Sequence, residues 1–107
     1  MDWGMKNRLS RIIKPSDNRT VMLAVDHGYF MGPTTGLENL GKTVLPLLPY
    51  ADTLMLTRGS LRRYIPPEND IPIVLRISGG TSIVGKELLH EGIITSMKDA
   101  IRLNVSG

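Results

Sequence analysis

The segment TVMLAVDHG occupies positions 20–28 and decides how the rest of the sequence is interpreted. Its first six residues are apolar or β-branched, and no polar residue alternates with them after Thr20. A continuous run of this length is typical of a strand buried on both faces, as in a parallel sheet. The run ends abruptly at Asp26, His27 and Gly28, so polar side chains stand directly at the end of the predicted strand.

Two later segments repeat this arrangement. Residues 52–57 (DTLMLT) are predicted to form a second strand, which ends at Arg58 and Gly59. Residues 72–78 (PIVLRIS) are predicted to form a third, which ends at Gly79 and Gly80. In parallel sheets the chemistry gathers at the carboxyl ends of the strands, so these strand ends are the strongest functional signal that the residues themselves give.

Helical patterns separate the predicted strands. The spacing of apolar residues predicts a short helix over 5–13, ended by Pro15. Thr43 is a suitable N-cap for a helix over 43–50, which would place Pro46 in its first turn. Further helices are expected over 60–64 and after Ser96, where Asp99 would complete a capping box. Residues 29–36 are expected to form a loop, and residues 93–95 a short extended segment.

The resulting order of strand, helix, strand, helix predicts an α/β fold with a parallel sheet. A (β/α)8 barrel takes about 250 residues, and 107 residues supply about the first three βα units and the approach to strand four. We therefore expect a helical lead-in over 1–19 and an incomplete TIM barrel over 20–107, with the chain cut short.

Composition excludes several classes of protein. A sequence with 41% hydrophobic and 21% charged residues is typical of a globular domain. The absence of Cys excludes disulfides, a Cys-based zinc site and a thiol nucleophile. The longest apolar run is the five residues 21–25, whereas a membrane helix needs about 20, and no signal-peptide pattern is visible. A soluble cytoplasmic protein is expected.

The net charge of +3 comes entirely from residues 1–19. Five basic residues lie there against Asp2 and Asp17: Lys6, Arg8, Arg11, Lys14 and Arg19. This segment is either a solvated amphipathic lead-in, which is the favoured interpretation, or a nucleic-acid arm. Basic and aromatic residues do not interleave as they do where bases stack, so a nucleic-acid partner is not expected.

Asp26 and His27 are the predicted catalytic residues. A carboxylate and an imidazole at the mouth of a buried strand can perform acid–base chemistry or hold substrate hydroxyls. Adjacent strand residues point to opposite faces, so the two should not share one role, and Asp26 is the preferred site residue. The alternative is a simple strand-to-loop turn in which Asp26 bonds to nearby backbone.

Arg58, Gly79 and Gly80 are the predicted substrate-binding residues. Arg58 begins a basic cluster with Arg62 and Arg63 that would suit phosphate, although an exposed helix face is the favoured alternative. Gly79 and Gly80 could present successive N–H groups to an anion, or could simply form a turn.

No metal site and no Schiff-base lysine are predicted. His90 lies in a polar stretch, is expected to be exposed, and has no second His at ligand spacing. A Schiff base needs a lysine whose pKa is lowered by burial. None of the five lysines falls on a predicted strand: Lys6, Lys14, Lys42, Lys86 and Lys98.

Taken together, the motifs resemble the autoinducer-2 thiolase branch of the archaeal-type class I fructose-bisphosphate aldolase family. The matching strings cover essentially the whole chain: DWGMKNRLSRI (2–12), TVMLAVDHGYF (20–30), GPTTGL (32–37), LTRG (56–59), VLRISGGTSI (74–83) and SMKDAIRLN (96–104). The resemblance implies a (β/α)8 barrel, a phosphorylated dicarbonyl or ketose as substrate, and homo-oligomers. It implies carbon–carbon cleavage through a lysine on the sixth strand, with coenzyme A as acyl acceptor in the thiolase and no other cofactor.

On the same resemblance, Asp26 falls on the acidic residue expected to contact substrate hydroxyls or carbonyl, and His27 falls on the histidine of the motif. The family lysine and phosphate loops have no counterpart among the 107 residues, so we expect the chain alone to be inactive. An alternative is a non-catalytic half-barrel subunit that a separately encoded partner completes. A small basic nucleic-acid binder using residues 6–19 is the weaker alternative.

Overall fold

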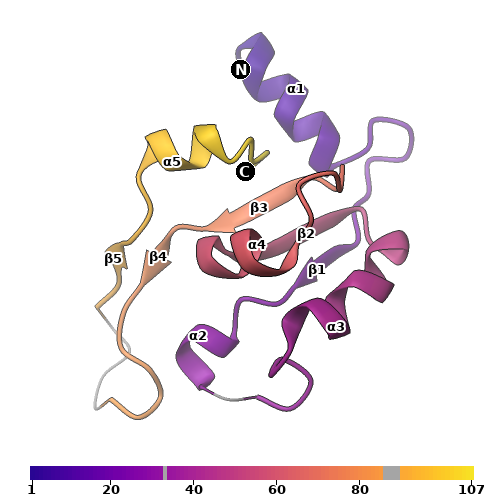
Figure 1. Cartoon of the computed structure of the whole chain (residues 1–107). Helices are drawn as coiled ribbons and strands as arrows, with labels where there is room; N and C mark the ends of the chain where they lie inside the picture. The colour runs from indigo at the N-terminus through magenta and orange to yellow at the C-terminus, as the bar shows by residue number, and fades with distance from the viewer. Residues whose placement is uncertain (33, 86–89) are drawn as a thin grey trace.

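A parallel three-stranded sheet organises the chain. The computed structural model describes residues 1–32, 34–85 and 90–107. Strands β1 (Met22–Ala24), β2 (Thr53–Thr57) and β3 (Ile73–Arg76) lie side by side in the order of the sequence (Figure 1). Both neighbouring pairs in this three-stranded sheet, β1–β2 and β2–β3, are parallel. The strands lie where the three apolar runs predicted them, so the predicted α/β class with a parallel sheet is confirmed.

The last residues of the chain continue the hydrogen bonding of the sheet beyond β3. The backbone N–H of Ser106 donates to the carbonyl of Ile73 at 2.8 Å, and the N–H of Leu75 donates to the carbonyl of Gly107 at 2.8 Å. These bonds run in the sense of a parallel pair. Residues 105–107 therefore lie along the edge of β3 that β2 leaves open.

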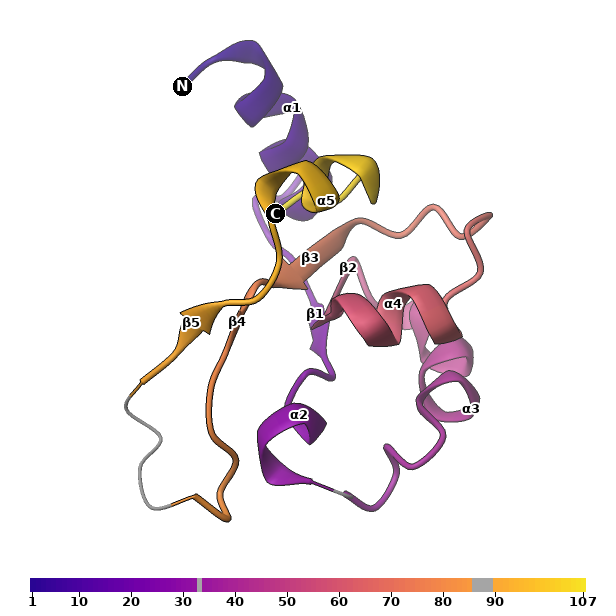
Figure 2. The same ribbon diagram turned by 60° about the vertical axis from the view of Figure 1, so that its left-hand side comes forward.

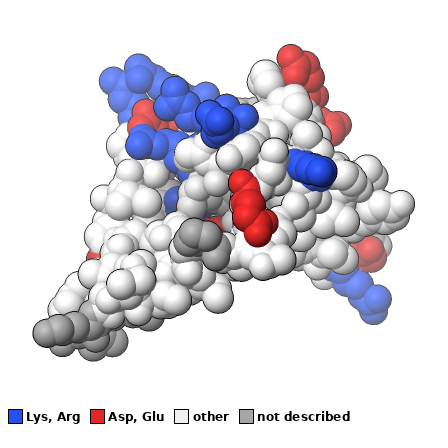
Figure 3. All heavy atoms as spheres, turned by 60° about the horizontal axis from the view of Figure 1, so that its bottom comes forward, with Lys and Arg blue, Asp and Glu red and all other residues white. Residues whose placement is uncertain are grey.

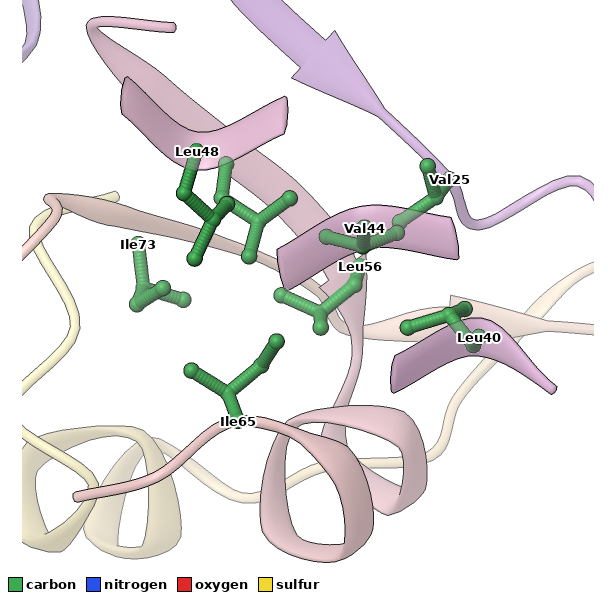
Figure 4. Packing of buried hydrophobic residues seen from close by; sticks show 8 residues of the cluster. Val25, Leu40, Val44, Leu48, Leu56, Ile65 and Ile73 are labelled. Atoms are coloured by element: carbon green, nitrogen blue, oxygen red, sulfur yellow. The ribbon is translucent and has the colours of Figure 1, made fainter. Parts of the chain in front are cut away.

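Helices cover one face of this sheet. Helix α3 (Leu40–Val44), the 3-10 helix η1 (Leu45–Tyr50) and helix α4 (Arg58–Tyr64) pack on the same side (Figures 1 and 2). The buried cluster between helices and sheet joins eight residues, seven of which are labelled in Figure 4: Val25, Leu40, Val44, Leu48, Leu54, Leu56, Ile65 and Ile73. The core of the described chain therefore lies on one side of the sheet.

The helix predicted over 43–50 begins earlier and changes character midway. Asn39 caps α3 by accepting from the N–H of Lys42 at 3.1 Å, so the predicted N-cap at Thr43 is wrong. Thr43 instead lies inside α3 and donates its hydroxyl to the carbonyl of Gly36. Pro46 has no N–H to continue the α-helical pattern, and the chain passes into η1 at Leu45.

Helix α1 (Trp3–Ile12) projects from the end of the sheet where the strands begin (Figures 1 and 2). It starts two residues before the predicted helix because the Asp2 side chain accepts from the N–H of Met5 at 2.7 Å. None of its residues is buried. Its contact with the sheet includes the Thr53 hydroxyl, which lies 3.4 Å from the carbonyl of Ile12. The domain division at residue 19 stays a prediction.

Three short elements lie at the opposite end of the sheet, and a fourth leads back from it toward α1 (Figures 1 and 2). The predicted loop over 29–36 contains helix α2 (Gly28–Met31), whose N–H groups at Met31 and Gly32 donate to His27 and Gly28. Strands β4 (Ser78–Gly79) and β5 (Gly92–Ile93) pair as an antiparallel hairpin. Helix α5 (Met97–Arg102) begins after Ser96, which accepts from the N–H of Asp99 at 3.1 Å, so that predicted cap is confirmed.

Among residues 1–32, 34–85 and 90–107, no helix has both the length and the apolar character that crossing a membrane would require.

Candidate functional site

Arg76 is the centre of a polar cluster at the carboxyl ends of β1 and β3. Its Nη1 lies 3.0 Å from Oδ2 of Asp26, and its Nη2 lies 2.6 Å from Oε1 of Glu91. Its Nε donates to the carbonyl of Ser78 at 3.2 Å. One guanidinium thus joins the end of β1, the end of β3 and the start of β5.

Tyr29 and Ser78 complete this cluster. The Tyr29 hydroxyl accepts from Nη2 of Arg76 at 2.8 Å and donates to Oε1 of Glu91 at 2.9 Å. The Ser78 hydroxyl donates to Oε2 of Glu91 at 2.7 Å. The guanidinium also lies over the Tyr29 ring, 4.6 Å from its centre, which adds a cation–π contact. We call Asp26, Tyr29, Arg76, Ser78 and Glu91 the Arg76 cluster.

The alternation of side chains along the strands explains why these residues meet. Ala24 pairs with Met55 and Met55 pairs with Val74, so these three residues point to the same face of the sheet. Asp26 and Arg76 each follow two residues later and therefore point to that same face. It is the face opposite the helices, and the two charged groups meet where its strands end.

The contacts within the cluster shift the pKa values of three groups. Hydrogen bonds from Ser78 and then from Tyr29 lower the pKa of Glu91 below its usual value. Desolvation, and then the hydrogen bond to Glu91, raise the pKa of Tyr29, so the phenol keeps the proton that it donates. The hydrogen bond to Asp26 raises the pKa of Arg76. At neutral pH the cluster therefore holds an ionised Glu91 and a protonated Tyr29 beside the guanidinium.

A hollow of about 460 Å³ adjoins the Asp26 side of the cluster. Asp26 and Tyr29 line it together with three polar side chains from β2 and α4, namely Thr57, Ser60 and Tyr64. The Asp26 side chain is 12% exposed, so it is largely shielded from solvent.

The two predicted catalytic residues are separated as the sequence suggested. Asp26 enters the Arg76 cluster, whereas His27 is the residue before α2 and makes no side-chain hydrogen bond to the helix start. The carbonyl of His27 accepts from the N–H of Met31 at 3.0 Å. The structure gives Asp26 charged contacts suited to chemistry, and the catalytic role of both residues stays a prediction.

The predicted substrate-binding residues lie outside the Arg76 cluster. Arg58 begins α4 and forms an ion pair with Asp99 of α5 at 2.7 Å, so this cation links two helices. Arg62 and Arg63 are exposed on α4, in agreement with the favoured alternative of a solvated helix face. Arg58 is therefore paired with a carboxylate in the structure, and the contact of Arg58 with phosphate stays a prediction.

Gly79 and Gly80 allow a close approach between two backbones. A Cβ on Gly80 would lie 2.5 Å from the carbonyl oxygen of His90, and one on Gly79 would lie 3.1 Å from the Ile94 side chain. These two close contacts explain why glycine occupies both positions beside the β4–β5 hairpin. Their binding of an anion stays a prediction.

Four members of the cluster were not identified from the sequence. The sequence places Tyr29 in a predicted loop and Glu91 in a polar stretch with no predicted element, and it places Arg76 and Ser78 in the third predicted strand. A signal was present, because a charged residue inside the run PIVLRIS has to find a partner when its strand is buried. What the sequence lacked was the register that brings Arg76 opposite the end of β1, fifty positions away.

Within the described residues, no group of three His, Asp or Glu side chains is placed to hold a metal ion. His90 is exposed, as predicted. Of the lysines, Lys6, Lys42 and Lys98 lie on helices, Lys14 lies in the turn after α1, and Lys86 lies outside the described residues.

Basic side chains do not form a continuous band on the face drawn in Figure 3. Lys and Arg gather at one corner, with acidic side chains among them, and acidic groups separate them elsewhere. This pattern differs from the uninterrupted basic stripe that tracks a nucleic-acid backbone. Binding of nucleic acid by residues 6–19 stays the weaker prediction.

No family model matches the sequence. Several curated proteins, however, are similar to it in sequence. The chain is 57% identical over 105 residues to the 3-hydroxy-5-phosphonooxypentane-2,4-dione thiolase of Photorhabdus laumondii, a match that covers 98% of this chain and 36% of that protein. The thiolase of the same name from Escherichia coli K12 is 56% identical over 104 residues, covering 97% and 35%. An uncharacterised aldolase of Pasteurella multocida is 54% identical over 106 residues, covering 99% and 36%.

Solved structures agree with these relatives on the fold. An archaeal fructose 1,6-bisphosphate aldolase matches with a TM-score of 0.73 at 20% identity, over 94% of this chain and 41% of that one. A Schiff-base-forming fructose-1,6-bisphosphate aldolase matches with a TM-score of 0.74 over the same shares. The chain spans about a third of the length of the curated relatives it matches. The resemblance drawn from the motifs is therefore confirmed. Along nearly its whole length this chain is similar to the N-terminal part of the 3-hydroxy-5-phosphonooxypentane-2,4-dione thiolases, and its fold matches that of an archaeal fructose 1,6-bisphosphate aldolase.

Proposed function

We propose that the chain provides the first three βα units, and the approach to the fourth strand, of an aldolase-like (β/α)8 barrel. The complete barrel would cleave a carbon–carbon bond in a phosphorylated dicarbonyl or ketose and would pass an acetyl group to coenzyme A. The observation that carries this proposal is the position of Asp26, which lies beside Arg76 at the carboxyl ends of β1 and β3. In barrels of this class, the residues that do chemistry stand at that edge.

Asp26 would act on the substrate directly. Its carboxylate lies 3.0 Å from a guanidinium nitrogen at the carboxyl edge of the sheet, and Asp26 is one of the residues that line the adjoining hollow. A carboxylate so placed can accept a hydrogen bond from a substrate hydroxyl or take its proton as the carbon–carbon bond breaks. Arg76 fixes the direction in which the carboxylate points, because its Nε and Nη2 are bound by Ser78 and Glu91.

The 107 residues alone would not complete the reaction. Cleavage through a Schiff base needs a desolvated lysine, and the described lysines lie on helices or in a turn rather than at the carboxyl edge of the sheet. Incubation with fructose 1,6-bisphosphate and borohydride should therefore leave the mass of the isolated chain unchanged. A covalent adduct on any of its lysines would contradict this proposal.

A chimera tests the proposed role of the chain in catalysis. Residues 1–107 replace the matched segment of the Escherichia coli thiolase, to which they are 56% identical. We expect the chimera to cleave 3-hydroxy-5-phosphonooxypentane-2,4-dione in the presence of coenzyme A, and Asp26→Asn to lower kcat at least about 100-fold. Asp70→Asn, an exposed acidic residue in the loop before β3, is the matched control and should leave kcat unchanged.

Two results would overturn the proposal. One is a chimera that folds, as judged by its circular dichroism and cooperative melting, but shows no turnover. The other is an Asp26→Asn chimera with the kcat of the parent chimera.

A second candidate is a non-catalytic half-barrel subunit that closes on a separately encoded partner. The observation that favours it is the uneven cover of the sheet, since Met22 is 38% exposed on the face opposite the helices. A partner carrying strands four to eight should co-purify with this chain at a fixed stoichiometry. Isolation of the chain as a monomer from its own cells would count against this candidate.

A further inference from the structure

Three hydrogen-bond donors of the Arg76 cluster converge on the carboxylate of Glu91. Nη2 of Arg76 lies 2.6 Å from Oε1, and the Tyr29 hydroxyl donates to the same oxygen at 2.9 Å. The Ser78 hydroxyl donates to Oε2 at 2.7 Å. A guanidinium and two hydroxyls arranged around one carboxylate are the chemistry of an oxyanion-binding site.

Two of these donors, Arg76 and Tyr29, are held in place by contacts that do not involve Glu91. Nη1 of Arg76 is fixed by Asp26 and its Nε by the carbonyl of Ser78. The Tyr29 ring packs under the guanidinium and meets the Phe30 ring edge-on, with ring centres 5.2 Å apart. If the Glu91 side chain turned away, Arg76 and Tyr29 would keep their positions, and the Ser78 hydroxyl would stay beside them because its backbone is paired in β4.

Glu91 is the most exposed member of the cluster. Its side chain is 41% exposed, whereas that of Arg76 is 20% exposed and that of Asp26 is 12% exposed. Glu91 immediately precedes β5, whose pairing to β4 runs through backbone groups. Rotation of this side chain into solvent would therefore leave the strand pairing intact.

The charges of the cluster are compatible with replacement of Glu91 by an external oxyanion. Arg76 carries one positive charge against two carboxylates, so the cluster is negative while Glu91 is in place. Departure of Glu91 leaves a neutral Asp26–Arg76 pair with three unused donors. An incoming oxyanion then restores the same contacts, with the same charge if it is a carboxylate and a more negative one if it is a phosphoryl group.

We propose that Arg76, Tyr29 and Ser78 form a binding site for the oxyanion group of a small molecule, a carboxylate or a phosphoryl group, and that Glu91 occupies this site as an internal competitor. This inference does not rest on the carbon–carbon cleavage proposed above, because the site is complete within the 107 residues. An intramolecular competitor weakens apparent affinity by the fraction of molecules in which it holds the site.

Removal of the competitor tests the proposal. The probes are inorganic phosphate and sodium acetate, titrated into the ¹⁵N-labelled 107-residue chain while the Nε signal of Arg76 is followed by NMR. Glu91→Ala should bind at least one of the two probes at least about tenfold more tightly than the unchanged chain. Glu68→Ala, at an exposed acidic position in the loop between α4 and β3, is the matched control and should bind as the unchanged chain does.

Two further variants keep the test decisive. In the Glu91→Ala background, Tyr29→Phe with Ser78→Ala removes two donors and should reverse the gain. If Glu91→Ala loses its cooperative melting, Glu91→Gln replaces it, since the amide keeps the shape and removes the charge, and it should show a smaller gain in the same direction.

The outcomes separate as follows. Tighter phosphate binding identifies a phosphoryl site, and tighter acetate binding identifies a carboxylate site. Equal affinities in the folded Glu91 variants and the unchanged chain would overturn the proposal, as would a gain that survives loss of Tyr29 and Ser78. An inactive chimera would remove the proposed function and leave these titrations unaffected.

Discussion

The two faces of the β1–β2–β3 sheet differ sharply although their residues alternate along the same strands. On one face, Leu54 and Leu56 are fully buried under α3, η1 and α4. On the other, Met22 and Ala24 are exposed and Met55 is only partly buried, and only Thr53, beside the end of α1, is fully buried among these positions of β1 and β2. That second face carries Asp26 and Arg76 where its strands end.

This difference shows that stability and chemistry are assigned to opposite faces by single-residue alternation. Substitutions at neighbouring positions of one strand should therefore have unlike effects. The following changes test that separation, from the largest expected effect to the smallest.

Leu54→Ala should be the most damaging change. It empties a fully buried position in the core, which costs about 2–5 kcal/mol, a large part of the stability of a small domain. Met55→Ala, the next residue on the same strand, should cost less than half as much because its side chain lies on the partly covered face. Urea unfolding followed by circular dichroism measures both free energies of unfolding. Equal losses of free energy in the two variants would contradict the difference between the two faces of the sheet.

Arg76→Met should destabilise the chain by about 1–3 kcal/mol, because charged hydrogen bonds are lost and a largely shielded Asp26 carboxylate is left unpaired. Adding Asp26→Asn to Arg76→Met should restore part of that loss, since the stranded charge is gone. The same unfolding experiment gives the free energies, and a double variant less stable than Arg76→Met would contradict the ion pair.

Acid should weaken the Arg76 cluster through Glu91. Because folding lowers the pKa of Glu91 below its usual 4.5, the ionised group adds stability above about pH 4.5 that is lost as the pH falls through the folded-state value. The difference in melting temperature between the unchanged chain and Glu91→Gln should therefore shrink between pH 6 and pH 3. Melting curves in buffers free of phosphate and acetate measure it, and a difference that does not vary with pH would be evidence against this linkage.

Arg58→Ala should have the smallest effect. Its ion pair with Asp99 joins two side chains that are 41% and 40% exposed, and such pairs contribute about 0.5 kcal/mol or less. The loss should also decrease in 1 M salt, which screens exposed pairs. Urea unfolding measures the change. A loss of unfolding free energy as large as that of Arg76→Met would show that charged pairs outside the Arg76 cluster contribute equally to stability.

The sequence predicted the elements that depend on neighbouring residues. Continuous apolar runs placed the three strands, and Ser96 with Asp99 placed the start of α5. The error at α3 has a local cause as well, because Asn39 and Thr43 are both suitable caps and the pattern of residues does not rank them. Asn39 is the cap that leaves Leu40 and Val44 facing the core.

The site was predicted only in part because it depends on contacts between distant residues. Asp26 was found because it directly follows a strand, a property of its own segment. Its partner Arg76 lies fifty residues later in the sequence, and only the parallel register aligns the two. Tyr29 and Glu91 come from segments with no clear periodicity, so no pattern in the sequence marks them.

The strand order also bears on how the chain reaches its fold. Because β1, β2 and β3 are neighbours in the order in which they are synthesised, each new strand can add to an edge that already exists. Residues 105–107 join β3 in the same way. The sheet can therefore grow in one direction as the polypeptide leaves the ribosome, and no strand has to insert between two that have already paired, which keeps loop closure short and local at every step.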